Sequence, residues 1–140
     1  SHASPFARIM EGGHARRLVQ VGIRTLNRHC REQAARFGVE IIKARHFRDD
    51  WRPRFDRPLY VSIDIDALDP AFAPGTGTPE VGGPNSWQAL QVARGLRGLN
   101  VVGADLVEVS PPFDPSGGTA WLGISLMFEM LCVMAERIGD

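Results

Sequence analysis

The chain has 140 residues, of which 44% are hydrophobic and 23% charged, and its 16 basic side chains balance 16 acidic ones. This suits one globular domain or part of a larger one. The even charge gives no electrostatic case for nucleic acid or a membrane surface as a partner, and we expect no apolar run to reach the ~18 residues of a membrane span. Cys30 and Cys132 lack metal-ligand spacing, and with no signal-peptide pattern they predict a cytoplasmic location.

The hydrophobic pattern predicts alternating helices and strands. In chain order the predicted elements are a short helix (4–13), a strand (16–25), a helix (27–38), strands (39–47 and 59–66), a helix (86–99), a strand (100–112) and a long apolar helix (117–139). Asn27 and Ser86 are the expected N-caps of their helices, and Gly38 stands where the second helix should end. This order predicts an α/β protein with a mostly parallel sheet.

Two other features of the sequence bear on function. The segment 67–86 contains four prolines and four glycines with little periodicity, and a stretch of this length is usually functional or disordered. Several arginines near the start are interpreted first as a solvated helix face or subunit contact, and only second as a basic binding site. They are Arg16, Arg17, Arg24, Arg28 and Arg31.

The stretch VSIDIDALDP, residues 61–70, places carboxylates where a strand ends. Residues i and i+2 of a strand share a face, so Asp64 and Asp66 are expected to project together, about 6.6 Å apart along the chain. Ligands of open α/β sheets bind at this end of the strands. Because two adjacent carboxylates repel each other, a divalent cation or a pair of cations would stabilise them.

Other interpretations of the two aspartates stay open from spacing alone. They could cap neighbouring helices or pair with arginines. A phosphoryl-transfer nucleophile of the haloacid dehalogenase type is disfavoured, because Leu68-Asp69-Pro70 follows in place of a small hydroxylated residue. Glu108 ends another apolar strand and should face the same crevice, where it could bind a cationic group or pair with an arginine. Asp105, deeper in that strand, is expected to be a structural hydrogen-bond acceptor.

Three motifs resemble the ureohydrolase family of arginases, agmatinases and guanidino-acid hydrolases. They are SHASPF, SIDIDALDPAFAPGTGTPEVGG and GADLVEVSPPFD, in the family's order over residues 1–114. The resemblance implies a three-layer α/β/α fold with a parallel sheet. It also implies hydrolysis of a guanidino compound to urea and an amine, by a hydroxide that two Mn²⁺ ions bridge. A small guanidino molecule is then the partner, and a homo-oligomer is expected.

The resemblance assigns a role to each matching residue. Asp64 and Asp66 match two metal-ligand aspartates, and Glu108 matches the glutamate that holds the guanidinium. His2 matches a histidine proposed as proton shuttle, and Thr78 matches a residue lining the substrate pocket. Asp69 is expected to stabilise a turn. The remaining histidines, His14, His29 and His46, match nothing in the family's site and are expected to be structural or on the surface.

The family's upstream metal-ligand motifs, Gly-Gly-Asp-His and Asp-x-His-x-Asp, do not occur in the chain. With the opening on Ser1-His2, this predicts the C-terminal portion of a single ureohydrolase domain over residues 1–140. We expect the isolated chain to be inactive. Agmatine is the predicted substrate, with arginase or guanidinobutyrase specificity as alternatives. The non-enzyme alternative is a truncated, inactive scaffold module.

Overall fold

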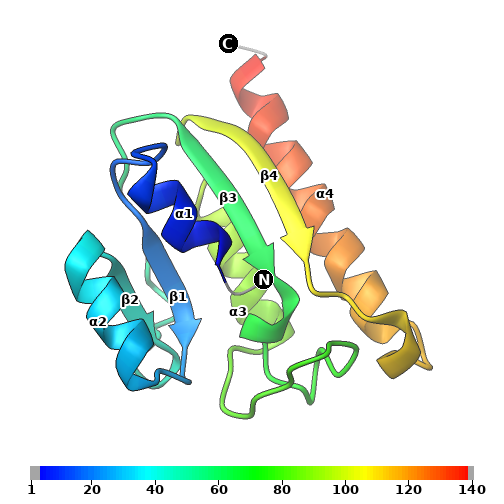
Figure 1. Cartoon of the computed structure of the whole chain (residues 1–140). Helices are drawn as coiled ribbons and strands as arrows, with labels where there is room; N and C mark the ends of the chain where they lie inside the picture. Colours follow the sequence, from blue (N-terminus) through cyan, green and yellow to red (C-terminus); the bar gives the residue numbers. More distant parts are fainter. Residues whose placement is uncertain (1–3, 139–140) are drawn as a thin grey trace.

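A computed structural model of the chain describes residues 4–138. Its helices are α1 (Pro5–Glu11), α2 (Arg28–Phe37), α3 (Ser86–Arg94) and α4 (Gly118–Ile138). Its strands are β1 (Val19–Ile23), β2 (Glu40–Lys43), β3 (Leu59–Asp64) and β4 (Val101–Val107), and three short 3-10 turns are η1 (Ala44–His46), η2 (Ile65–Ala67) and η3 (Pro111–Phe113). Figure 1 shows this order along the chain.

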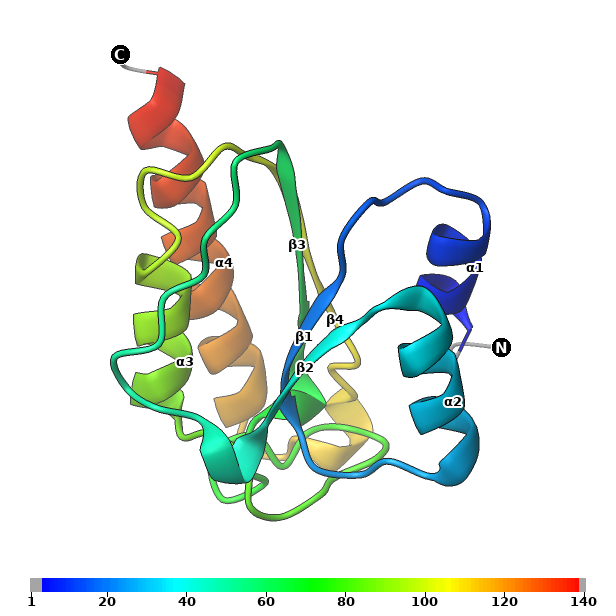
Figure 2. The same ribbon diagram turned by 90° about the vertical axis from the view of Figure 1, so that its left-hand side faces the viewer.

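The strands form the middle layer of three. Figure 2 shows α3 and α4 on one side of the strands and α1 and α2 on the other. Strand β1 pairs in parallel with β2, and β3 pairs in parallel with β4. Within residues 4–138 these are two separate two-stranded sheets. The parallel α/β/α architecture expected from the sequence is therefore confirmed.

Local capping contacts explain where α2 and α3 begin and where α2 ends. The side chain of Asn27 accepts the Cys30 amide at 2.8 Å, and Gly38 ends α2 with a φ of 63°, so both predictions for this helix are confirmed. Ser86 as N-cap was wrong. Asn85 caps α3 instead, in a reciprocal capping box with Gln88, and Ser86 is the first helical residue.

The core lies between α3, α4 and the β3–β4 pair. Its buried apolar side chains are Ile65, Leu68, Ala73, Ala93, Leu96, Val101, Leu126, Met130 and Val133. Glu129 on α4 pairs with Arg94 on α3 at 2.5 Å. The opposite face of α4 exposes Trp121, Ile124, Phe128 and Leu131.

The expectation that no apolar run is long enough for a membrane span was wrong. By length and composition, Gly118–Glu136 within α4 qualifies, with a mean hydropathy of 1.6, and 28% of that window is buried. A core helix of a soluble protein can pass the same test. Residues Leu126, Met130 and Val133 of this window belong to the core described above.

The arginines near the start of the chain do not form one solvated helix face. Arg17 precedes β1 and pairs with Glu40 of β2 at 2.5 Å. Arg28 lies on the exposed surface of α2 and pairs with Glu32 at 2.7 Å. Arg24 follows β1, is half-buried and donates to backbone carbonyls. The interpretation as a solvated helix face was therefore wrong for Arg17 and Arg24, and a subunit contact stays a prediction.

Candidate functional site

The two aspartates predicted to bind metal lie where β3 ends, but only one belongs to the strand. Asp64 is the last residue of β3, and Asp66 lies in the 3-10 turn η2. The alternation of a strand therefore does not relate them, and that part of the sequence argument was wrong. The turn instead brings the Asp66 amide to the Asp64 carboxylate, with N to Oδ1 at 3.2 Å.

Negative charge is concentrated around Asp64. Partial burial raises the pKa of the Asp64 carboxyl to about 7, and the charges of Asp66 and Glu108 add to this shift. Asp64 is the register partner of Val107, so Glu108 directly follows the β4 residue that lies beside Asp64. A bound cation would relieve the repulsion within this group of three carboxylates.

Thr78 reaches the same group from the loop between η2 and α3. Its hydroxyl donates to Asp66 Oδ2 at 2.8 Å, although the threonine itself is exposed. The resemblance assigned Thr78 to a substrate pocket and Asp66 to a metal, as separate roles. The structure adds a direct contact between them, so a change at either residue should affect the orientation of the other.

Glu108 has an unusual backbone conformation, with a φ of 66°. Among the described residues it is the only one other than glycine with a positive φ, and such strain is often held at functional positions. Contacts at the two residues that follow Glu108 hold the conformation. Thr76 forms an antiparallel bridge with Val109, and the Ser110 amide donates to the Gly75 carbonyl at 2.8 Å. This turn ends β4 at Val107, five residues before the predicted end.

The strain at Glu108 predicts an inverted order of stability for two substitutions. We expect Glu108→Gly to be more stable than Glu108→Ala by about 1 kcal/mol, because the left-handed conformation penalises a Cβ atom. Thermal unfolding of the full-length protein measures the difference. The same pair at Val107, an ordinary strand residue, is the control and should favour alanine. Equal stability of the two Glu108 variants would contradict the assigned backbone strain.

Hydrogen bonds order the loop 67–86, for which the sequence predicts either a functional or a disordered segment. Asp69 accepts the amides of Ala71 at 2.9 Å and Gly82 at 2.7 Å, which confirms its expected turn-stabilising role. These amides hold the pKa of Asp69 below its usual value. A Cβ atom at Gly83 would lie 2.6 Å from the Asp69 amide nitrogen, so only glycine fits there without movement of the backbone.

The other residues considered from the sequence are Asp105 and the four histidines. Asp105 accepts from Ser62 Oγ at 2.7 Å and Tyr60 Oη at 2.9 Å, which confirms it as a structural acceptor. His2, the predicted proton shuttle, lies outside the described residues. The exposed histidines are His14, His29 and His46.

The described part of the chain does not complete a metal site. Within residues 4–138, no group of three or more His, Cys, Asp and Glu side chains is arranged to hold a metal ion. Asp64 and Asp66 nevertheless offer the hard oxygen donors that manganese accepts, and their mutual repulsion favours a cation. These two residues therefore fit part of a metal-ligand set and would need further ligands.

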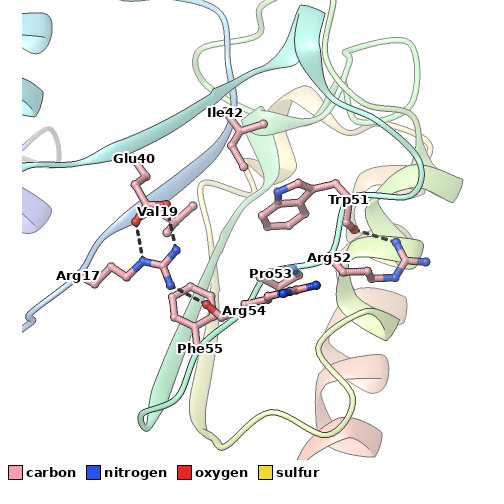
Figure 3. A pocket seen from close by; sticks show the side chains of 9 residues that line it. All are labelled: Arg17, Val19, Glu40, Ile42, Trp51, Arg52, Pro53, Arg54 and Phe55. Carbon is pink, nitrogen blue, oxygen red and sulfur yellow. Dashed lines mark hydrogen bonds and ion pairs between the residues drawn. The ribbon is translucent and has the colours of Figure 1, made fainter.

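A cavity of about 220 Å³ lies away from these carboxylates (Figure 3). Val19 and Glu40, which help to line it, are the first residues of β1 and β2, whereas Asp64 ends β3. Arg17 in its wall is bound to Glu40 and stacks on Phe55 at 4.6 Å. None of the predicted site residues lines this cavity, and of its charged side chains Arg17 and Glu40 pair with each other.

The geometry agrees with the comparison to known sequences. The sequence signature of the Arginase family matches residues 1–132, which include every residue assigned above. The chain belongs to the arginase family. The members of this family to which it is similar include the guanidinopropionase of Pseudomonas aeruginosa, 48% identical over 97% of this chain and 47% of that protein. The mitochondrial guanidino acid hydrolase of Homo sapiens is 44% identical over 96% of this chain and 42% of its own length.

Solved structures of arginase-family proteins share the fold. A hypothetical agmatinase from Burkholderia thailandensis superimposes with a TM-score of 0.84 and 36% identity, over 99% of this chain and 46% of that chain. An arginase from Medicago truncatula gives 0.82 and 40%, over 96% and 45%. The chain thus spans about half the length of the arginase-family proteins it matches.

Proposed function

We propose that the protein containing this chain hydrolyses a small guanidino compound to urea and an amine, with two Mn²⁺ ions in the complete site. The observation that carries the proposal is the group of Asp64, Asp66 and Glu108, brought together at the ends of two parallel strands in a chain of the arginase family. Three carboxylates are enough for two of them to bind metal and for the third to bind a cationic substrate.

Asp64 and Asp66 would hold manganese together with ligands from outside the described residues. The raised pKa of Asp64 supports this, because a carboxyl that is partly buried and also close to other carboxylates gains most from a cation. Bound manganese would supply Lewis-acid activation of water. Thr78, through its 2.8 Å hydrogen bond, would hold the Asp66 carboxylate in one orientation.

Glu108 would bind the substrate's guanidinium. A carboxylate and a planar guanidinium form charge-assisted, often bidentate, hydrogen bonds, which fix the guanidino carbon in position. The strained backbone of Glu108 supports a functional role, since it aims the side chain away from the regular direction of the strand. His2 would deliver a proton to the leaving amine as a general acid.

We propose two candidate substrates. Agmatine is the compound that the sequence motifs favour. A guanidino acid is the second candidate, supported by relatives named guanidinopropionase, guanidinobutyrase and guanidino acid hydrolase. The two differ at the end distant from the guanidino group, where agmatine carries an amine and the acids carry a carboxylate.

Urea release from a panel of guanidino compounds tests the proposal. The manganese-loaded full-length protein should release urea from agmatine, guanidinopropionate or guanidinobutyrate in preference to arginine. Chelation of the metal should stop the reaction, and readdition of Mn²⁺ should restore it. If no compound of the panel yields urea and the matching amine, the proposed function is wrong.

Three further expectations belong to this proposal. The 140-residue chain alone should be inactive in the same assay, since residues 4–138 do not form a full ligand set; activity there would contradict this. A homo-oligomer is expected, and sedimentation of the full-length protein would test it. A cytoplasmic location is likewise proposed, and cell fractionation would test it.

A further inference from the structure

Arg24 uses its side chain to bind two separate segments of backbone. Nη1 donates to Ala67 O at 2.9 Å, and Nη2 donates to Asp66 O at 2.9 Å and to Leu68 O at 3.1 Å. Nε donates to Glu80 O at 3.0 Å and to Val81 O at 3.1 Å. Nη2 also donates to Glu80 O. The guanidinium therefore joins segment 66–68 to segment 80–81.

The acceptors distinguish Arg24 from Arg17 and Arg28. Arg17 and Arg28 pair with carboxylates, whereas within residues 4–138 no ion pair joins Arg24 to a carboxylate. Its acceptors near η2 are carbonyls at the end of a 3-10 turn, which have no partners inside the turn. A cation at such an end is also electrostatically favourable. The planar guanidinium supplies enough donors for both segments at once.

The end of β1 is shaped to deliver this side chain. Gly22 has a φ of 83°, and the register of β1 against β2 shifts between Val21 and Ile23. A Cβ atom at Gly22 would lie 3.5 Å from the Ala67 carbonyl oxygen, so the strand passes close to η2. Gly22 O also accepts from Arg24 Nη1 at 3.1 Å. The bulge thus brings Arg24 to the turn that carries Asp66.

One of the joined segments contains a site residue and the other lies close to one along the chain. Asp66 is in the first segment, and Thr78 lies two residues before the second. The 2.8 Å hydrogen bond from Thr78 to Asp66 therefore runs beside the backbone contacts that Arg24 makes. Movement of either segment would therefore change both the direction of the Asp66 carboxylate and the position of Thr78.

We propose that Arg24 is a positioning residue of the site. By clamping segment 66–68 to segment 80–81, it sets the orientation of the Asp66 carboxylate and of Thr78, and so the affinity for manganese and the binding of the guanidino substrate. The inference rests on the proposed function, because it acts through residues assigned to metal and substrate. A residue that follows β1 would then control the geometry of a site whose carboxylates lie at the ends of β3 and β4.

Arg24→Lys in the full-length protein tests the clamp. Lysine keeps the charge but, as a compact point charge, cannot bind both segments in one plane. We expect the Kd for Mn²⁺ to rise about 10–100-fold, the usual effect of losing a residue that orients metal ligands. The KM should rise and kcat should fall in the urea assay. Mn²⁺ titration followed by electron paramagnetic resonance measures the affinity independently of activity.

Arg28→Lys is the matched control, because Arg28 pairs with Glu32 on the exposed surface of α2. It should leave Kd, KM and kcat unchanged. A folded Arg24→Lys protein whose Mn²⁺ affinity and kinetic constants match those of Arg28→Lys would overturn the inference. If Arg24→Lys does not fold, Gly22→Ala replaces it, since an alanine at that φ disturbs the bulge that presents Arg24. An unchanged Mn²⁺ affinity there would overturn the inference equally.

The outcomes also separate this inference from the proposed function. A wild-type protein that binds Mn²⁺ but releases no urea from the panel contradicts the function, while the affinity comparison still decides the role of Arg24. If the wild type is active and the Arg24→Lys variant keeps its Mn²⁺ affinity and kinetic constants, only the positioning role of Arg24 is contradicted. A wild type that binds no Mn²⁺ contradicts both.

Discussion

Asp64→Ala and Asp66→Ala, each made in the full-length protein, should abolish urea release and lower bound manganese together. Each removes an anionic oxygen donor that the metal requires. The substitution at Asp66 also removes the acceptor of the Thr78 hydroxyl, so Thr78 and the loop around it should become less firmly held. Elemental analysis after manganese loading and the urea assay, performed on the same preparations, measure the two effects.

Asp105→Asn is the matched control for these variants. Asp105 is also an aspartate of the β3–β4 pair, but its carboxylate is bound to Ser62 and Tyr60. It should keep the wild-type manganese content and measurable activity. Full metal content in Asp66→Ala, with a wild-type rate, would remove the metal-ligand role of Asp66 and return it to the helix-capping or ion-pairing alternatives.

Glu108→Gln, the second prediction, should leave the metal bound while raising KM and lowering kcat. The neutral amide keeps the size and the strained backbone position of the glutamate but loses a charge-assisted contact with the guanidinium. Hydrogen bonds to charged groups contribute about 1.5–3 kcal/mol, which corresponds to roughly a 10- to 150-fold loss in kcat/KM. Steady-state kinetics and elemental analysis measure the two quantities.

The comparison with Asp66→Ala decides between two roles for Glu108. A substrate-binding carboxylate can be neutralised without loss of metal, whereas a ligand cannot. If Glu108→Gln loses manganese as readily as Asp66→Ala, Glu108 belongs to the metal-ligand set and not to the substrate pocket. Thermal unfolding should show the glutamine variant close to wild type, because the backbone of Val109 and Ser110 keeps its contacts with the loop.

Local chemistry made parts of the fold predictable from the sequence. Asn27 and Gly38 mark the ends of α2 through contacts within a few residues, and the apolar runs mark the strands. The start of a helix is harder to predict where two neighbouring residues could both act as its N-cap. Asn85 rather than Ser86 caps α3, because Gln88 lies three residues after Asn85 and completes a capping box.

The candidate site was only partly predictable. Its motif residues, Asp64, Asp66 and Glu108, could be selected because carboxylates at strand ends stand out in the sequence. Their geometry could not. The 3-10 turn that holds Asp66 and the positive φ of Glu108 depend on contacts with the loop 67–86, whose own sequence has little periodicity.

The sequence by itself determined the fold class, the family and the positions of the carboxylates, because these depend on local pattern and motif order. Only the tertiary structure decided what holds the carboxylates in place. Arg24 meets carbonyls 42 to 57 residues further along the chain, and a lone arginine after a strand carries no mark of such partners. Hydrogen bonds to backbone carbonyls are independent of the acceptor's side chain, so no sequence pattern records them until the chain is folded.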